Sequence, residues 1–353
     1  MASGPNTFAT MAVFTAEKFQ GNPLAIVSVH GNSLTQQRKS LIAKEFRCPA
    51  TCFLHDAAGP GQPRTLEIFT DKGEELPFLG HPVIGAAHFI FIYLEKLQYG
   101  GPADRDNNRQ TAVLLTKAGK IPIFFNPYRQ IAACAVPTTF HVHAHQVPME
   151  RIISTQPHVQ IVPTIDKEKG RTFPLVSIVK GLSFVLVDFT DNPELFATLE
   201  PGKAPEAELD QNWSPSFVGC MYYKLLAKSE QPGEPTIHNI QVRMMTNGTE
   251  DSGSGSGCSA LACYLALHGP SEAKDPKPSD QDADLAKKAE DLKLEAKTER
   301  KVFGIQQGVE MGRVSTIAVE VDVKTDTDGS RSITNVILSG RASAMSEGKL
   351  LGF

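Results

Sequence analysis

Two stretches of this chain each place a glycine-containing loop directly before a helix that is apolar on all sides. The first runs from Thr70 to Leu94, TDKGEELPFLGHPVIGAAHFIFIYL, and the second from Met244 to His268, MMTNGTEDSGSGSGCSALACYLALH. A helix that is apolar all round has no polar face to present to water, so it cannot lie on a protein surface. Each stretch therefore predicts a helix in the middle of its own domain.

The two stretches also match each other in spacing. Three residues of the first recur at the same intervals in the second: Gly73, Glu75 and Gly80 correspond to Gly248, Glu250 and Gly255. The residue after the last glycine is His81 in one copy and Ser256 in the other. This repetition, in a chain of 353 residues, predicts two related domains, each large enough for its own core.

The loops before both helices have the composition of an anion-binding site. The first backbone N–H groups of a helix have no partner within the helix, and the helix dipole places partial positive charge there. A glycine at this point lets a carboxylate or phosphate approach the backbone closely. The alternative is a flexible Gly-Ser linker or a simple turn, which such a composition also fits when a single copy is considered.

Charge and hydropathy favour a small molecule as the partner. The chain carries 35 basic and 39 acidic residues, which gives no long-range attraction to nucleic acid or to an anionic membrane. No apolar run reaches the roughly 20 residues of a membrane span, and the first residues lack the pattern of a signal peptide. We therefore expect a cytoplasmic protein. The six cysteines are scattered without zinc-binding spacing, so we expect them to be reduced and mostly buried.

The order of predicted elements suggests a boundary near the middle of the chain. We assign residues 1–135 to an N-terminal domain, which the last residues, 345–353, could join, and residues 136–344 to a C-terminal domain. Residues 269–300 are dense in Lys, Asp and Glu. This charged run is predicted to be a surface insertion with one solvated helix.

An early helix carries a carboxylate close to its apolar side. Ser33 and Gln36 form a capping-box pattern, and an apolar stripe follows, made of Leu34, Leu41, Ile42 and Phe46. At about 100° per residue, Glu45 falls between members of this stripe. Burial there would raise its pKa above the ordinary value and suit it to proton transfer. The alternative is a solvated or paired residue at a helix end, because Arg38 lies on the same side.

Three histidines alternate in the second half. His141, His143 and His145 would point to one face of a strand, and imidazole is a common zinc ligand. No carboxylate is near enough in the sequence to complete a familiar ligand set. Exposed histidines on an edge strand account for the pattern, so we predict no metal site.

Several motifs together resemble one known family. They occur in order from near residue 10 to near residue 345: V-F-T-A-E-K-F-Q-G-N-P-L-A-I-V, I-A-K-E-F, P-F-x-G-H-P, E-D-x-x-x-G-S-G and Q-Q-G-V-E-M-G-R. In this combination the chain is similar to the PhzF-like phenazine-biosynthesis family, within the diaminopimelate-epimerase-like superfamily.

The resemblance implies an α+β fold of two similar domains, each a curved, mostly antiparallel sheet around a central helix, with the active site in the interdomain cleft. It implies a cofactor-independent isomerase that shifts a proton on a small carboxylate substrate of cyclic or unsaturated type. By motif, Glu45 is the acid/base residue, with Asp251 and His81 also catalytic. The implied substrate-binding residues are His81 itself with Gly80, Gly255, Ser256 and Asn22. No cofactor or metal is expected, and the resemblance leaves a homodimer open.

The chain also departs from its relatives. Thiol racemases of the superfamily have a catalytic cysteine before each of the two loops, but Leu79 and Ser254 occupy those positions here. The missing thiols argue against a two-thiol racemase, because leucine cannot transfer a proton. Two alternatives stay open: an epimerase that uses Glu45 and Asp251 in place of thiols, and a non-catalytic interaction protein on the same fold. The substrate itself is not predicted.

Overall fold

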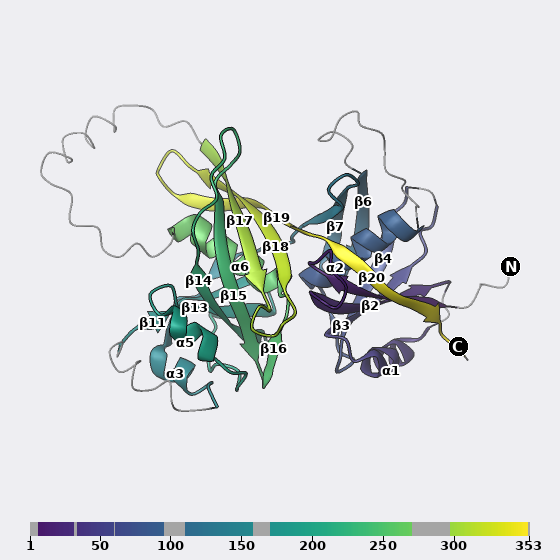
Figure 1. Ribbon diagram of the computed structural model, residues 1–353, viewed down its shortest axis with the longest axis horizontal. Coiled ribbons are helices and arrows are strands. Elements are labelled where there is room, and N and C mark those ends of the chain that lie inside the picture. Colours follow the sequence, from purple (N-terminus) through teal and green to yellow (C-terminus); the bar gives the residue numbers. More distant parts are fainter. Residues whose placement is uncertain are drawn as a thin grey trace, which may run out of the picture.

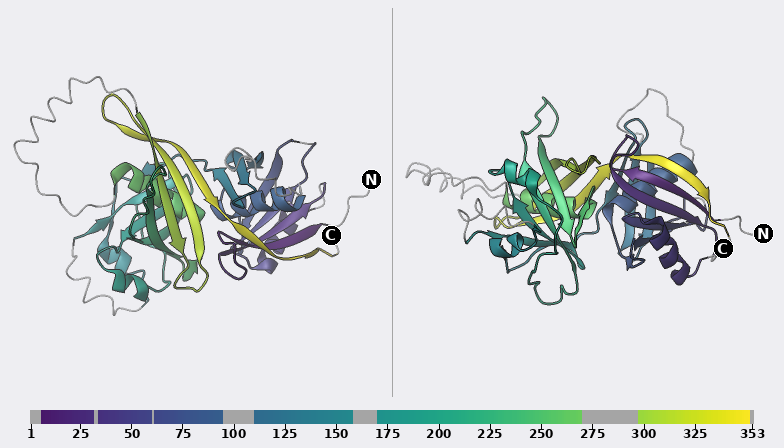
Figure 2. Two further views of the ribbon diagram at one scale, coloured as in Figure 1. Left: turned by 45° about the horizontal axis from the view of Figure 1, so that its top comes forward. Right: turned by 60° about the horizontal axis from the view of Figure 1, so that its bottom comes forward.

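The computed structural model describes residues 6–31, 34–59, 61–94, 110–157, 170–269 and 297–351. Figure 1 shows these residues in two lobes, the first built mainly from the early part of the chain and the second mainly from the later part. The last strand crosses from the second lobe to the first, as the views in Figure 2 also show.

Among the described residues, the first lobe contains eight strands of the early chain and two α-helices, the second of which continues into a short π-helix, η1. Its strands are β1 (Thr7–Val13), β2 (Asn22–Val29), β3 (Ala50–His55), β4 (Arg64–Thr70), β5 (Glu75–Leu76), β6 (Gln110–Thr116), β7 (Gly119–Asn126) and β8 (Ile131–Ala135). Its helices are α1 (Gln36–Phe46), α2 (Gly80–His88) and η1 (Phe89–Leu94).

The second lobe is built from longer strands around the helix α6. The strands of the later chain are β9 (His141–Val142), β10 (Val147–Pro148), β11 (Thr172–Phe173), β12 (Leu175–Val179), β13 (Leu182–Asp188), β14 (Phe217–Leu225), β15 (Ile237–Thr246), β16 (Thr249–Asp251), β17 (Lys297–Gln307), β18 (Ser315–Thr325), β19 (Arg331–Gly340) and β20 (Ala342–Lys349). The helices are α3 (Met149–Ile153), α5 (Pro193–Thr198) and α6 (Gly255–His268).

Most strand pairs are antiparallel, and the exceptions are β2–β3, β4–β6, β13–β14 and β15–β17. In the described residues, two strand pairings join the lobes: β8 pairs with β19, and β20 pairs with β1 along its length. The predicted α+β class with a mostly antiparallel sheet is therefore confirmed. The boundary between residues 135 and 136 stays a prediction.

Both predicted apolar helices begin at the glycines that the repeat singles out. Helix α2 starts at Gly80 and is buried at every residue, and α6 starts at Gly255 and is buried over most of its length. Helix α2 packs against β1, β2, β3, β7 and β8, whereas α6 packs mainly against β12, β13, β18 and β19. Residues of both helices belong to one continuous hydrophobic cluster. Each large apolar side chain buried in this way contributes about 1.5–3 kcal/mol, so the two helix starts are held firmly.

Helix α1 differs from its prediction in two respects. It begins at Gln36 with Thr35 as its N-cap, whose side chain accepts a hydrogen bond from the Arg38 amide. The proposed cap, Ser33, lies outside the described residues. Leu41 is expected to face inward but is 58% exposed, and the main strand contacts of α1 are with β3 and β4. The buried side of α1 therefore contains fewer apolar residues than predicted.

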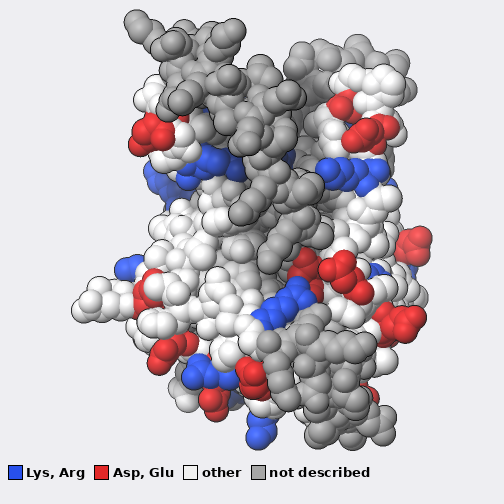
Figure 3. Space-filling model, turned by 90° about the vertical axis from the view of Figure 1, so that its left-hand side faces the viewer, with Lys and Arg blue, Asp and Glu red and all other residues white. Residues whose placement is uncertain are grey.

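The charged insertion falls mostly on residues 270–296, which lie outside the described residues, as does its predicted helix. Strand β17 begins at Lys297, three residues before the predicted end of the insertion at residue 300. On the face drawn in Figure 3, Lys and Arg side chains lie interspersed with Asp and Glu. Within the described residues, no helix has the length and apolar character needed to cross a membrane. All six cysteines are free thiols, and all except the partly exposed Cys48 are buried.

Candidate active site

The starts of α2 and α6 meet in backbone contact. A Cβ atom added to Gly80 would lie 3.0 Å from the Cα of Gly255, and one added to Gly255 would lie 3.1 Å from the Cα of Gly80. The side chain of Leu338 covers both glycines. Because each helix start carries partial positive charge, the two ends repel each other and together favour an anion beside them.

The residue after each glycine carries a buried polar atom without a partner. His81 and Ser256 are 4% and 3% exposed. Neither Nε2 of His81 nor Oγ of Ser256 has a hydrogen-bond partner among the described residues. Burial lowers the pKa of His81 to about 3, so its ring is neutral at physiological pH. Buried polar groups are rarely left unpaired, because this costs about 1–3 kcal/mol, so both atoms are candidates for contact with a ligand.

The two helix starts are capped differently. Leu79 precedes α2 and provides no side-chain cap, whereas the side chain of Ser254 accepts a hydrogen bond from the Gly257 amide. The Ser254 side chain thus accepts from the Gly257 amide of α6 and does not occupy the N–H groups that lie nearer the start of the helix. The structure places Leu79 and Ser254 at equivalent N-cap positions, as the repeat predicts. Cys258 lies within α6 and is fully buried, as expected for a core thiol.

Asp251 lies just before α6 and is held by two hydrogen bonds to one carboxylate oxygen. The side-chain amide of Asn22 donates to Oδ1 at 2.7 Å, and the Gly253 amide donates to the same atom at 2.9 Å. Burial raises the pKa of Asp251 to about 6; the bonds from Gly253 and Asn22 oppose this rise, and nearby Glu250 adds to it. A carboxyl group with a pKa close to neutral is suited to exchange protons.

Asn22 connects the first lobe to this loop. Its Nδ2 also donates to the Gly253 carbonyl at 3.0 Å, while its Oδ1 is buried without a partner among the described residues. The Ser315 hydroxyl is likewise buried and unpartnered, and it would lie 2.7 Å from a Cβ atom on Gly253. Unpaired donors and acceptors are therefore gathered along the loop that leads into α6.

Gln307 holds the same loop in place. The sequence does not predict this role. This fully buried residue ends β17, donates from Nε2 to the Asp251 carbonyl at 2.7 Å, and accepts at Oε1 from the Ser254 amide at 2.9 Å. The two bonds fix the backbone on both sides of Gly253. The Q-Q-G-V-E-M-G-R motif contains Gln307, but nothing in that motif reveals a partner more than fifty residues away.

The prediction that Glu45 is buried on the apolar side of its helix is wrong, because Glu45 is exposed. The strand register places the segment that follows α1 beside Asn22. Helix α1 ends at Phe46, and Ala50 at the start of β3 pairs with Leu24, two residues after Asn22. The chain after α1 therefore enters the sheet at the same end of the strands as Asn22.

A second observation connects this end of the strands with the second lobe. The pKa of the Cys48 thiol is raised by burial and lowered by the positive charge of Arg313. Arg313 also donates from Nε to the Gly21 carbonyl at 3.2 Å. The segment that follows Glu45 thus lies within electrostatic range of a side chain from the second lobe.

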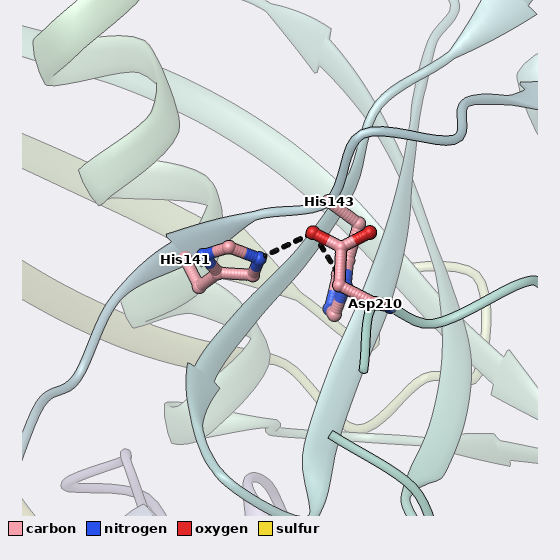
Figure 4. Close-up of side chains that lie close together, drawn as sticks. All are labelled: His141, His143 and Asp210. Carbon is pink, nitrogen blue, oxygen red and sulfur yellow. Dashed lines mark hydrogen bonds and ion pairs between the residues drawn. The ribbon is translucent and has the colours of Figure 1, made fainter. Parts of the chain in front are cut away.

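The predicted histidine run does not form a three-residue face. Strand β9 covers only His141 and Val142, His143 is buried, and His145 is exposed. The expectation that no carboxylate lies close is also wrong, because Asp210 contacts His141 at 2.7 Å between its Oδ2 and the ring Nε2. Figure 4 shows the carboxylate of Asp210 beside both imidazole rings. Asp210 could not be identified from the sequence, since it lies 67 residues from His143.

A family model that matches most of the chain decides which family the chain belongs to. The model of the PhzC-PhzF family, described as phenazine biosynthesis-like protein, matches residues 11–348. The chain belongs to the PhzC-PhzF family. The resemblance inferred from the motifs is thereby confirmed.

Several PhzC-PhzF relatives are named isomerases. An uncharacterized isomerase of Pasteurella multocida is 37% identical over 120 residues, which cover 34% of this chain and 37% of the relative. The trans-2,3-dihydro-3-hydroxyanthranilate isomerase of Pseudomonas aeruginosa is 25% identical over 268 residues, which cover 74% of this chain and 80% of the relative. The match thus spans little more than a third of the Pasteurella protein but most of the Pseudomonas enzyme.

Solved structures show the same fold. A PhzF-family protein of Bacillus anthracis has a TM-score of 0.61 at 17% identity, with 99% of both chains covered. A predicted epimerase of Pseudomonas aeruginosa has a TM-score of 0.59 at 19% identity and covers 99% of this chain and 100% of its own. A probable proline racemase from Agrobacterium radiobacter has a TM-score of 0.51 at 12% identity and covers 98% of this chain and 92% of its own. The PhzC-PhzF fold therefore extends over the whole described chain.

Proposed function

We propose that this protein is a cofactor-independent isomerase that shifts a proton on a small carboxylate-bearing substrate. The observation that supports this proposal most strongly is the contact between the two helix starts at Gly80 and Gly255. Beside it lie two unpartnered buried polar atoms, from His81 and Ser256. The names of the relatives, which are isomerases, support the same class of reaction.

In this proposal the substrate carboxylate binds beside the two adjoining helix starts. Its negative charge is stabilised by the backbone N–H groups of both helices and by the Ser256 hydroxyl. The neutral ring of His81 offers a further hydrogen bond at Nε2. Two dipoles aimed at one anion fix the orientation of the substrate before any proton moves, and such orientation supplies a large part of enzymatic rate enhancement.

Glu45 then removes a proton from a carbon of the substrate and returns it at another position of the conjugated system. The carboxylate of Glu45 is exposed, so a ligand can reach it from solvent. A ligand that covers Glu45 would remove water from it, which strengthens a carboxylate as a base. Positioned acid/base catalysis contributes about 10²- to 10⁴-fold to the rate.

Asp251 has a different part in the proposed reaction. Its Oδ1 already accepts two hydrogen bonds, so Oδ2 is the oxygen that would accept from an amino or hydroxyl group of the substrate. Because its pKa is near 6, the group can also give or take a proton at neutral pH. Asp251 is therefore the second candidate for proton transfer if Glu45 is not the base.

The test is deuterium incorporation from heavy water, measured by mass. We suggest a panel of cyclic, unsaturated amino and hydroxy acids that includes trans-2,3-dihydro-3-hydroxyanthranilate, the compound named for the Pseudomonas relative. Wild-type protein should label at least one member. Glu45→Gln should lower labelling about 100-fold or more, while the exposed Glu194→Gln on α5 should label like the wild type. Unchanged labelling by Glu45→Gln, together with lost labelling by Asp251→Asn, would transfer the role of base to Asp251.

A second candidate function is epimerisation with two carboxyl groups. Glu45 and Asp251 come from different lobes, and a structure of similar fold is described as a predicted epimerase. The two candidates differ in their product, since an epimerase inverts one carbon and an isomerase moves a double bond or hydrogen. Chiral chromatography of the labelled compound, together with its ultraviolet spectrum, distinguishes them.

A further inference from the structure

Two histidines and an aspartate form a cluster that the proposed reaction does not use. Nε2 of His141 and Oδ2 of Asp210 are 2.7 Å apart, and Nδ1 of His143 is 3.9 Å from the same oxygen. One potential ligand atom from each residue lies within 4.8 Å of the other two. Figure 4 shows that the interactions of both rings meet at one oxygen of Asp210.

We propose that His141, His143 and Asp210 bind a divalent transition-metal ion of the zinc type. Two imidazoles and one carboxylate are a donor set that such ions accept with a fourth position left for water. The side chains of His141 and Asp210 are 33% and 25% exposed, so an ion can enter from solvent and keep a water ligand. This inference does not depend on the proposed isomerase activity.

Surrounding residues hold His143 in the orientation that a ligand needs. Its Nε2 lies 2.8 Å from the hydroxyl of Ser177, which continues through Ser183 to Ser216 at 2.7 and 2.8 Å. The other nitrogen, Nδ1, accepts a hydrogen bond from the Asp210 amide at 3.1 Å. Nδ1 therefore carries a lone pair. A hydrogen bond on the far nitrogen is the usual outer-shell support for a metal-binding histidine.

His141 is held by an aromatic ring. The Trp213 ring stacks on it with a centroid distance of 4.6 Å and an interplanar angle of 10°.

Binding requires a limited rearrangement. Ligands at 2.0–2.1 Å from a tetrahedral zinc ion are about 3.3 Å apart, so the widest separation in the cluster must shrink by up to about 1.5 Å. The ion would replace the hydrogen bond between His141 and Asp210 and the bond from the Asp210 amide to His143. We therefore expect weaker binding than at a closed site with four protein ligands.

The test is calorimetric titration of the chelator-treated full chain with zinc alone. The variants are His141→Ala, His141→Gln and Asp210→Asn, and His145→Ala is the matched control, because His145 belongs to the same run but lies outside the cluster. His141→Gln keeps a hydrogen-bond donor toward Asp210, so a loss of binding in this variant does not reflect misfolding. Circular dichroism of each variant checks the fold.

Wild-type protein and His145→Ala should bind one zinc ion per chain, and the other three variants should bind at least tenfold more weakly. Cobalt in place of zinc should give visible absorption bands that His141→Gln removes. No stoichiometric binding by the wild type would overturn the proposal, and so would equal binding by all variants. If Asp210→Asn only lowers the melting temperature and the wild type takes up no zinc, the cluster is a hydrogen-bonded tether between β9 and the segment of Asp210.

Discussion

The replacement Asp251→Asn should stabilise the protein and abolish its proposed activity. Burial raises the pKa of Asp251 from 3.8 to about 6, so the folded state prefers the protonated carboxyl. At any pH where Asp251 is ionised, its charge therefore destabilises the folded state. Asparagine removes the charge, keeps an oxygen that accepts from Asn22 and from the Gly253 amide, and has nearly the same shape.

The magnitude follows from proton linkage. Each pH unit between the two pKa values is worth about 1.36 kcal/mol, so the ionised group costs about 3 kcal/mol at pH 7.5. The stability deficit is absent well below pH 3.8, grows as pH rises toward 6, and is then constant. At pH 4.5 only about 1 kcal/mol of it has developed. Because Asp251 is only partly buried, solvent screening makes these values upper limits.

Urea unfolding of the wild type and Asp251→Asn at pH 7.5 and pH 4.5 measures this difference. We expect the variant to be more stable by about 1–3 kcal/mol at pH 7.5 and by about a third of that at pH 4.5. The exposed Asp71→Asn is the control and should change stability by less than about 0.5 kcal/mol at either pH. A variant that is equally destabilised at both pH values would refute the reasoning, because the hydrogen bonds to Oδ1 would then outweigh burial.

Three further predictions concern the surroundings of the site. Gln307→Ala should slow labelling by about tenfold or more and shift the pH profile of labelling, because the loop of Asp251 loses two hydrogen bonds; an unchanged profile in a folded variant would argue against a positioning role. Gly255→Ala should cost about 1–3 kcal/mol in urea unfolding, because the added Cβ meets the Gly80 backbone at 3.1 Å; an unaffected variant would mean that the helix starts can separate freely. Burial raises the pKa of Glu67, but hydrogen bonds from His55, Lys39 and Gln36 outweigh it and bring the pKa to about 2. Glu67→Gln should therefore lose about 2–3 kcal/mol at pH 7 and less near pH 3, since the stability from ionised Glu67 is present above about 4.5 and disappears as pH falls toward 2; equal losses at both pH values would contradict this assignment.

The features that the sequence predicts well are local ones. The starts of α2 and α6 follow from the spacing of Gly80 and Gly255 and from the apolar runs after them. Gly73 and Gly248 confirm the repeat, because both have positive φ angles, 75° and 76°, in turns that precede the helices. Such signals need only the neighbouring residues.

Other features depend on packing that the sequence does not contain. The periodicity of α1 suggests an inward Leu41 and a buried Glu45, but the helix contacts too little of the sheet to cover either residue. Gln307 reaches Asp251 across 56 positions, and Asp210 reaches His143 across 67. Tertiary contacts over these distances follow from strand order, which no local pattern in the chain specifies.

The contact between the helix starts is tested most directly by a crystal structure with a bound cyclic amino acid. The ligand should be a compound that the protein labels or, failing that, 2-aminobenzoate, which has the same ring size and carboxylate as the Pseudomonas substrate. We predict carboxylate oxygens about 2.7–3.2 Å from backbone nitrogens at the starts of both α2 and α6. A carboxylate bound away from Gly80 and Gly255, or held by only one of the two helices, would contradict the proposed function.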